Sequence, residues 1–291
     1  MIKIYVPKDS AARAVGAEEV ADAIMAEAAA RKIDVKIIRN GSRGLLWLEP
    51  FVEVETPKGR VAFGPVEVSD VKSLFDSKFH EGGTHRLSLG LTEELPYLKN
   101  QERLTFARCG ITDPLSLEDY ISHGGFVGLK KALTKSGAEI VAEVTTSGLR
   151  GRGGAGFPTG IKWKTVHDAK ADQKYVCCNA DEGDSGTFAD RMVMEGDPFM
   201  LIEGMTIAGI AGSATKGFIY IRSEYPDAIR VMKDAIRIAT AAKWLGQNIQ
   251  GSAHSFSLEV RRGAGAYICG EETAMLDSLE GKRGMVRPKP P

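Results

Sequence analysis

Apolar and polar positions in the first 76 residues repeat with two different periods. Short runs such as Ile2–Val6 have the composition of strands, whereas Ala17–Lys32 carries apolar residues at the spacing of an amphipathic helix. Pro57–Gly59 predicts a turn between two further strand-like runs, and Ser69 is suited to cap a short helix. The predicted strands are residues 2–6, 35–38, 47–54 and 60–66, and the predicted helices are residues 17–32 and 70–75.

The order of these elements is strand, helix, strand, a pair of strands and a final helix. Small thioredoxin-like domains have this order, and we expect residues 1–76 to form one. Residues 77–115 show little periodicity and are expected to form an extended connector. Residues 1–108 contain no cysteine, so the front domain lacks ligands for a cysteine-bound iron–sulfur cluster, which leaves it a docking role.

Helix-like and strand-like segments alternate over residues 116–291. The predicted strands are residues 175–179, 217–222 and 256–262, and the predicted helices are residues 116–122, 126–135, 138–146, 198–209, 226–243 and 271–279. This alternation favours an α/β domain with a mainly parallel sheet. The sequence therefore predicts an α/β protein with a thioredoxin-like domain followed by a larger domain at residues 116–291.

Composition excludes several classes of function. The 38 basic and 38 acidic residues cancel, so no overall field attracts nucleic acid or an anionic membrane. The apolar stretch 199–214 is interrupted by Glu203 and by glycines and is too short to span a bilayer. The first residues lack the pattern of a signal peptide, and the four cysteines form no CxxC pair. We expect a cytoplasmic protein whose cysteines are buried as small hydrophobic residues and which has no metal site of its own.

A glycine-rich segment, Gly148–Gly160, is the sharpest local feature of the chain. Gly151, Gly153 and Gly156 match the GxGxxG spacing of dinucleotide-binding proteins. That fingerprint follows a strand, whereas the residues before this segment predict a helix. The match alone therefore does not indicate a Rossmann fold.

The density of glycines nevertheless predicts a ligand. Backbone without side chains can approach a flat or phosphorylated molecule closely. Arg150, Arg152 and Lys162 place positive charge around the segment, as a diphosphate requires, and Phe157 offers a ring to an adenine. The alternative is a glycine-rich surface loop that binds nothing.

Three carboxylates follow the predicted strand at residues 175–179, within the run Asn179–Gly186. Ligands of α/β sheets bind at the carboxyl ends of strands. Carboxylates at such an end accept hydrogen bonds from ribose hydroxyls and repel a 2′-phosphate, which favours NAD over NADP. The alternative is a solvated turn rich in Asp and Gly.

A second glycine turn, Gly263–Gly265, connects a predicted strand to a predicted helix. This turn and Tyr267 suit a flat ring packed against the backbone. Glu271 and Glu272 fall in the first turn of the helix, where carboxylates complement the helix dipole. A capping role alone would account for them.

These segments together resemble the 51 kDa-like family of NADH-binding flavoproteins, which respiratory complex I, NAD-reducing hydrogenases and NAD-dependent formate dehydrogenases share. The likeness covers about residues 100–291. The matching segments, in the family's order, are Arg108–Tyr120, Gly151–Gly160 with Lys162 and Trp163, Asn179–Gly186, Tyr267–Thr273 and Lys289–Pro291. The run Ala180–Arg191 and the thioredoxin-like front are most similar to the beta subunit of molybdenum formate dehydrogenases.

The resemblance implies where cofactors bind. FMN is implied to lie against Gly151, Arg152, Gly153, Gly154, Lys162, Asn179, Asp181, Tyr267, Gly270, Glu271 and Glu272. NAD(H) is implied to lie over the flavin, beside Gly156, Phe157, Glu182, Asp184 and Lys289. No side chain is expected to act as a catalytic acid or base, because the flavin carries the chemistry. Thr165 stands where relatives often have a second adenine-stacking aromatic residue, so adenine stacking is expected to be weaker here.

The activity implied by the resemblance is electron transfer between NAD(H), FMN and iron–sulfur centres. In a formate dehydrogenase the net direction is from formate to NAD⁺, and the expected partners are a formate-oxidising molybdenum subunit and a small iron–sulfur subunit. One alternative is the same diaphorase role in an NAD-reducing hydrogenase or respiratory complex I. Another is a docking module that keeps the fold but binds no flavin.

Members of the family continue through a loop that closes over the flavin, a ubiquitin-like domain and a domain that binds [4Fe–4S] through cysteines. None of these has a counterpart within the 291 residues. We therefore expect no cluster ligands in this chain, a flavin site that is open on one side, and weak binding of FMN.

Overall fold

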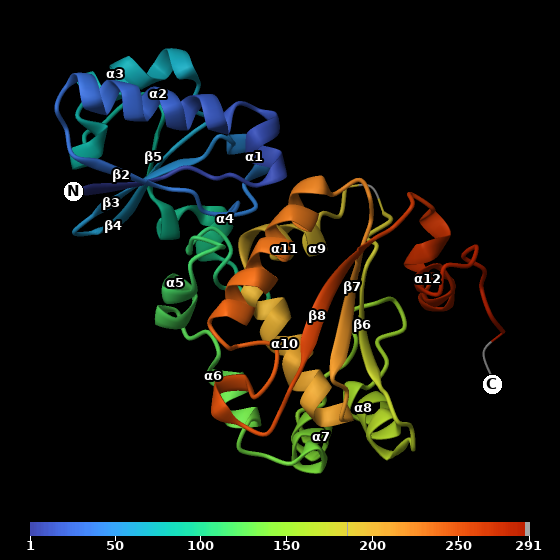
Figure 1. Ribbon diagram of the computed structural model, residues 1–291. Helices are drawn as coiled ribbons and strands as arrows, with labels where there is room; N and C mark the ends of the chain where they lie inside the picture. Colours follow the sequence, from blue (N-terminus) through green and yellow to red (C-terminus); the bar gives the residue numbers. More distant parts are fainter. Residues whose placement is uncertain (185, 289–291) are drawn as a thin grey trace. The chain divides into compact units, whose positions relative to one another are not determined.

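The computed structural model describes residues 1–184 and 186–288 (Figure 1). The chain divides into two compact units. Unit 1 contains Met1–Tyr120 together with Glu195–Asp197, and unit 2 contains Ile121–Met194 and Pro198–Pro291. Both units combine helices with strands, as the predicted α/β class requires.

The sheet of unit 1 has the strand order β2-β1-β3-β4-β5. β1 (Ile2–Tyr5) and β2 (Val35–Ile38) are parallel, because the chain returns between them through α2 (Ala17–Ala30). β3 (Val52–Thr56) and β4 (Gly59–Phe63) form an antiparallel hairpin, and β3 also pairs antiparallel with β1. A parallel pair followed by an antiparallel hairpin is the core of the thioredoxin-like arrangement predicted from the sequence.

Two helices, α2 and α3 (Val71–Asp76), lie side by side over the sheet of unit 1 (Figure 1). The apolar side chains between helices and sheet form one buried cluster. Its larger members are Ile4, Val20, Ile24, Val54, Phe63, Leu74, Phe75 and Phe79. The helical stripe and the strand alternation read from the sequence therefore face the same core.

The first strand of the hairpin is shorter than the sequence predicts. A strand is predicted over residues 47–54, whereas the structure has a 3-10 turn at Leu46–Leu48 and starts β3 at Val52. Pro50 lies between the turn and the strand and has no N–H to donate to a sheet. Pairing in the sheet therefore begins only after the proline, at Val52.

Residues 77–115, for which a connector is expected, contain regular structure. β5 (Ser88–Leu91) pairs antiparallel with β4, and α4 (Pro96–Lys99) is a short helix. β5 gives a weak sequence signal because it has only four residues, one of which is Gly90 with φ 89°. Its hydrogen bonds to β4 hold it in the sheet.

Unit 1 buries charged groups beside its apolar core. Arg43 and Glu53 form an ion pair at 2.9 Å, and their side chains are only 2% and 0% exposed. A second nitrogen of Arg43 bonds to Glu93 at the surface. The pair links the loop after β2 to β3, two segments on either side of β1 in the sheet.

Glu49 is another buried carboxyl group of unit 1. The Ser42 hydroxyl and the Phe51 N–H each lie 2.8 Å from one of its oxygens. Burial, and after it the nearby carboxyl of Asp9, raise the pKa of Glu49 to about 8. The folded state therefore holds a proton here that the unfolded chain releases at neutral pH.

The sheet of unit 2 is parallel, in the order β6-β7-β8. The strands are β6 (Tyr175–Ala180), β7 (Lys216–Ile221) and β8 (Ser257–Arg262). α10 (Pro198–Gly212) and α11 (Pro226–Ala241) connect them and pack against the sheet, on the same side in Figure 1. The parallel sheet predicted from the helix–strand alternation is confirmed.

α12 (Glu272–Leu279) lies on the other side of this sheet in Figure 1. Its Met275 packs in a small cluster with Tyr220 of β7 and Cys269. Cys177 of β6 borders the same cluster, whereas its neighbour Cys178 alternates to the other face. The four cysteines form no disulfide.

Three of the remaining helices in the described residues are not predicted from the sequence. They are α1 (Ser10–Ala14), α8 (Thr159–Asp168) and α9 (Ala189–Gly196). α7 (Gly137–Thr146) is predicted, so the glycine-rich segment follows a helix as expected. The short helices α5 (Leu117–Ser122) and α6 (Val127–Ala132) are also predicted. Within residues 1–184 and 186–288, no helix is long and apolar enough to cross a membrane.

The buried Glu49 makes a prediction about pH. Because its pKa is about 8 in the folded state and about 4.5 in the unfolded chain, its contribution to stability is fully present below pH ~4.5 and is lost as pH rises through ~8. Glu49→Gln should stabilise unit 1 at pH ~8.5 by a few kcal/mol, since each pKa unit corresponds to about 1.4 kcal/mol. The measurement is thermal unfolding across this pH range. Glu94→Gln controls for net charge, and an unchanged pH profile in Glu49→Gln would contradict the assignment.

Candidate functional site

The glycine-rich segment forms a closed loop between α7 and α8. The Gly151 N–H donates to the Phe157 carbonyl at 2.8 Å, and the Thr159 N–H donates to the Leu149 carbonyl at 2.9 Å. Within this loop the Gly156 N–H donates to the Gly153 carbonyl at 3.1 Å. The loop is therefore fixed by its own backbone at both ends.

The glycines of this loop are required for different reasons. At Gly160 a Cβ would lie 2.6 Å from the Cα of Thr145, so the missing side chain allows α8 to pack on α7. Gly156 has φ +53°, in the left-handed region. Gly153 and Gly154 have neither constraint, because a Cβ there would meet nothing within 4 Å. The chain's own packing therefore leaves open space above Gly153 and Gly154.

That open space belongs to a cavity of about 600 Å³ in unit 2. Three segments form it: the glycine loop with the first turn of α8, the end of β6, and the start of α12. The lining residues are Gly151, Gly153, Gly154, Ala155, Gly156, Phe157, Lys162, Asn179, Gly270, Glu271 and Glu272. Its size is that of a pocket for a small molecule or cofactor.

Hydrogen bonds fix two walls of the cavity to each other. The side-chain amide of Asn179 donates to the Gly270 carbonyl at 2.9 Å and accepts from the Asp181 N–H at 3.2 Å. A Cβ on Gly270 would lie 3.2 Å from the Asp181 carbonyl oxygen, so glycine allows this approach. The end of β6 and the turn before α12 therefore hold one geometry.

Glu271 caps α12. One of its carboxylate oxygens accepts from the N–H groups of Thr273 and Ala274, each at 2.9 Å. The capping role considered from the sequence is thus present, and Glu271 also lines the cavity together with Glu272.

Glu182 caps a different helix. Its side chain is buried, at 9% exposure, and accepts hydrogen bonds from the first N–H groups of α9. The donors are Ala189 at 2.7 Å, Asp190 at 3.0 Å and Arg191 at 3.3 Å. The Tyr225 hydroxyl donates to the same carboxylate at 3.1 Å. Burial, and after it Glu182, raise the pKa of Tyr225 to about 12, so this hydroxyl keeps its proton.

Asp184 and Tyr267 meet above Gly183. The Tyr267 hydroxyl donates to Asp184 at 3.1 Å, and a Cβ on Gly183 would lie 2.7 Å from the Tyr267 ring. The ring remains 72% exposed. Burial raises the pKa of Asp181 at the base of this loop, and the charge of Arg222 opposes the rise. Residues Asp181–Asp184, called the acidic loop below, are therefore in contact with an exposed tyrosine from the turn before α12.

The structure brings most of the candidate ligand-binding residues to one cavity. Those that line it are Gly151, Gly153, Gly154, Gly156, Phe157, Lys162, Asn179, Gly270, Glu271 and Glu272. Arg152, Asp181, Glu182, Asp184 and Tyr267 lie in the same loops without lining it. Lys289 lies outside the described residues. Ala155 lines the cavity and was missed, although its position between two glycines was the available signal.

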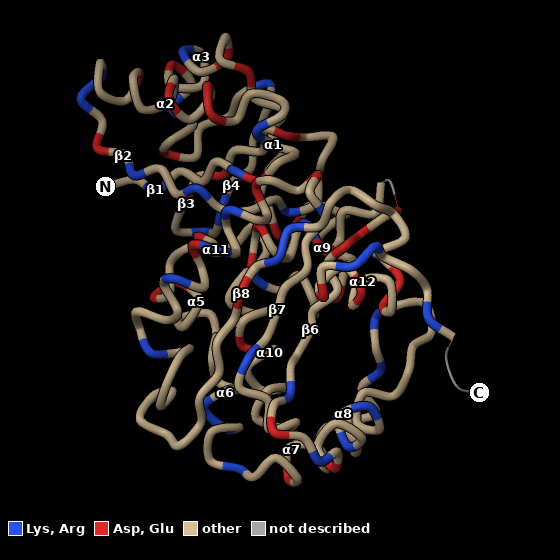
Figure 2. The backbone as a smooth tube through the Cα atoms, turned by 45° about the vertical axis from the view of Figure 1, so that its right-hand side comes forward, with Lys and Arg blue, Asp and Glu red and all other residues tan. Residues whose placement is uncertain are grey.

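Charges of both signs border the cavity. Lys162 is contributed by α8 and Glu272 by α12. Figure 2 shows basic residues on α8 and acidic residues beside α12. An anionic group on a ligand is therefore favoured near the glycine loop and α8, and hydroxyl donors near α12.

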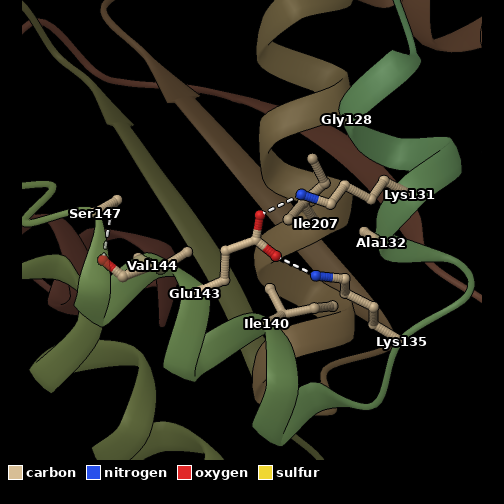
Figure 3. Close-up of a pocket in the computed structure, with 9 residues that line it drawn as sticks. All are labelled: Gly128, Lys131, Ala132, Lys135, Ile140, Glu143, Val144, Ser147 and Ile207. Carbon is tan, nitrogen blue, oxygen red and sulfur yellow. Dashed lines mark hydrogen bonds and ion pairs between the residues drawn. The ribbon is translucent and has the colours of Figure 1, made fainter.

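A second cavity, of about 340 Å³, has different chemistry (Figure 3). Lys131 and Lys135 point into it and both donate to Glu143. Hydrogen bonds from these two lysines lower the pKa of Glu143 to about 2. Much of the remaining lining is apolar, including Ile140 and Ile207. Because the lysine charges are already partnered, this cavity offers less to an anionic cofactor than the glycine-loop cavity.

Comparison with known proteins identifies the class. Residues 144–291 match the Complex1_51K family, described as the Nuo51 FMN-binding domain. This match spans all three segments that form the glycine-loop cavity. The chain belongs to this family of flavoproteins, whose cofactors are FMN and NAD(H).

Particular relatives narrow the comparison. The chain is 55% identical over 193 residues to the NADP-reducing hydrogenase subunit HndC of Solidesulfovibrio fructosivorans, covering 66% of this chain and 39% of the relative. It is 43% identical over 198 residues to the mitochondrial NADH-ubiquinone oxidoreductase 51 kDa subunit of Neurospora crassa, covering 67% and 40%. The chain thus spans about 40% of the length of these relatives.

A solved structure extends the likeness to the whole chain. The NAD⁺-reducing [NiFe]-hydrogenase in its H₂-reduced state matches with a TM-score of 0.53 and 27% identity. The match covers 100% of this chain and 48% of that one.

The surroundings of the glycines predict that replacement by alanine changes stability differently at Gly160 and at Gly154. Gly160→Ala should lower the free energy of unfolding of unit 2 by about 1–3 kcal/mol, because its Cβ would collide with the backbone of Thr145. Gly154→Ala should change it by less than about 0.5 kcal/mol, because the space is open. Denaturant unfolding of both variants measures the difference. Equal destabilisation would contradict the assignment of separate roles.

Proposed function

We propose that this chain is the NAD(H)- and FMN-binding part of an electron-transfer oxidoreductase that acts in the cytoplasm. Hydride is exchanged between NAD(H) and the flavin, and single electrons are exchanged with iron–sulfur centres of partner subunits. The observation that carries the proposal is the open space over Gly153 and Gly154 inside a cavity shared by Lys162 and Asn179. The packing of the chain does not require glycine at these two positions. A flat ring bound against the backbone would require it, because a side chain would occupy the position of the ring.

The residues of the cavity fit FMN. Gly153 and Gly154 let the ring approach the backbone, and the Lys162 ammonium favours an anionic group. Asn179 holds the opposite wall through its bond to Gly270. FMN, when bound, supplies the exchange between two-electron and one-electron chemistry, so the protein's own task is to bind and orient.

The nucleotide is proposed to lie beside the same loop. Phe157 is 48% exposed at the cavity and can stack on an adenine, a contact worth roughly 1 kcal/mol beyond the burial of area. Gly156, Glu182, Asp184 and Lys289 remain its other proposed neighbours. Asp184 is exposed, whereas Glu182 is buried. Asp184 is therefore better placed than Glu182 to repel a 2′-phosphate.

The proposed setting is an NAD-dependent formate dehydrogenase, with formate oxidised on a molybdenum subunit and a small iron–sulfur subunit between. The run Ala180–Arg191 supports it by its resemblance to that beta subunit. A nickel–iron hydrogenase setting is the second candidate, because the solved structure that resembles the whole chain is an NAD⁺-reducing [NiFe]-hydrogenase. The metal that co-purifies with the native complex, molybdenum or nickel, distinguishes the two.

Flavin binding should depend on the two glycines that have open space. Gly153→Ala and Gly154→Ala should each weaken FMN affinity by about tenfold or more, because the added methyl occupies the ring's position. FMN fluorescence quenching on titration gives the affinity. Gly204→Ala is the matched control, since its Cβ also meets nothing within 4 Å but lies in α10, away from the cavity. Unchanged affinity in both loop variants would remove FMN from this cavity.

Nucleotide selectivity should depend on Asp184. Asp184→Asn removes the charge but keeps an oxygen that can accept from Tyr267, so the loop is preserved. The preference for NADH over NADPH should narrow by about tenfold, because the repulsion of the 2′-phosphate falls. Ratios of kcat/KM with an artificial acceptor provide the measurement. A selectivity that stays the same while NADH oxidation is intact would sink the assignment.

A further inference from the structure

Two loops meet at the carboxyl ends of β6 and β7. Arg222, the first residue after β7, donates a hydrogen bond from its guanidinium to the backbone carbonyl of Glu182 in the acidic loop. The same guanidinium donates to Glu224 at 3.2 Å and lies 5.1 Å from the centre of the Tyr225 ring. Arg222 therefore bridges the acidic loop and the loop that leads into α11.

Tyr225 makes the second connection. Its ring is buried, at 6% exposure, and its hydroxyl donates to the Glu182 carboxylate at 3.1 Å. With three N–H groups of α9 on the same carboxylate, each oxygen of Glu182 accepts two hydrogen bonds, which is the full capacity of the group. Glu182 thus joins three segments: the acidic loop, the first turn of α9 and the loop after β7.

This junction adjoins the part of the acidic loop that contacts Tyr267, which lies in the same 3-10 turn as Gly270 of the cavity lining. Gly183 follows Glu182 directly and lies under the Tyr267 ring, and Asp184 bonds to the Tyr267 hydroxyl. A displacement of Glu182 moves both contacts, because only one or two peptide units separate them. The hydrogen bonds of the buried Glu182 side chain therefore help to fix the positions of Gly183 and Asp184.

We propose that Tyr225 and Arg222 are positioning residues for nucleotide binding, acting through Glu182 to hold Gly183 and Asp184 against Tyr267. This inference rests on the proposed function, because it assigns the acidic loop to the nucleotide. Tyr225 and Arg222 do not line the cavity and act on NAD(H) only through the loop. Glu182 is the residue through which both act.

Tyr220 provides a matched comparison. It lies on β7, is 2% exposed, and its hydroxyl bonds to the Ser278 hydroxyl at 2.9 Å. Tyr220→Phe and Tyr225→Phe therefore each remove one hydroxyl from a buried ring in the same part of unit 2, together with its hydrogen bonding. They differ in that Tyr225 alone of the two reaches the acidic loop.

The test uses the full chain in two states. In the FMN-free chain, Tyr225→Phe should speed amide hydrogen exchange in segment 181–191, and Tyr220→Phe should not. In the FMN-loaded chain with ferricyanide as acceptor, Tyr225→Phe should raise the KM for NADH about three- to tenfold with little change in kcat. Tyr220→Phe should leave the KM unchanged.

A double variant tests the route through Glu182. If Tyr225 acts through this carboxylate, adding Tyr225→Phe to Glu182→Gln should raise the KM by less than Tyr225→Phe does alone. Faster exchange with an unchanged KM, or fully additive effects, would overturn the inference and leave the proposed function standing. A wild-type chain that binds FMN but does not oxidise NADH would overturn both.

Discussion

The parallel pairing of β6, β7 and β8 is the constraint on which the site depends. Parallel strands end at one edge of a sheet, so the loops after them are neighbours although they are far apart in sequence. At this edge Asn179 binds the turn before α12, and Tyr225 binds the loop after β6. The glycine loop between α7 and α8 then supplies the remaining wall of the cavity.

Two carboxylates that sequence alone places at a ligand also stabilise helices. Glu271 caps α12, and Glu182 caps α9 from seven or more residues upstream. Replacing either one therefore removes a helix cap as well as a charge. The glycines of this segment also differ in role. Gly160 allows α8 to pack on α7, whereas Gly153 leaves open space in the cavity. Residues that the sequence marks as ligand candidates thus also serve the fold, and the geometry separates these roles.

Much of the fold and of the candidate site could be predicted from the sequence. Hydrophobic periodicity gave the parallel sheet of unit 2 and the thioredoxin-like order of unit 1, and glycine density and carboxylate position marked the cavity. α8 and α9 were missed because their reasons are not local: α8 packs on α7 where Gly160 meets Thr145, and α9 takes its cap from Glu182. The direction of the Glu182 side chain could not be predicted either. The position of a carboxylate in the sequence does not show which hydrogen-bond donors surround it in the fold.

The most direct test of the central claim is an anaerobic titration of the chain with FMN and then with NADH. Our account predicts that FMN binds one to one in the glycine-loop cavity, with its absorbance bleached by an equimolar amount of NADH. The bound flavin should also protect the amides of the glycine loop, residues 149–160, from hydrogen exchange. Flavin that binds without protecting this loop, or that NADH leaves oxidised, would contradict the account.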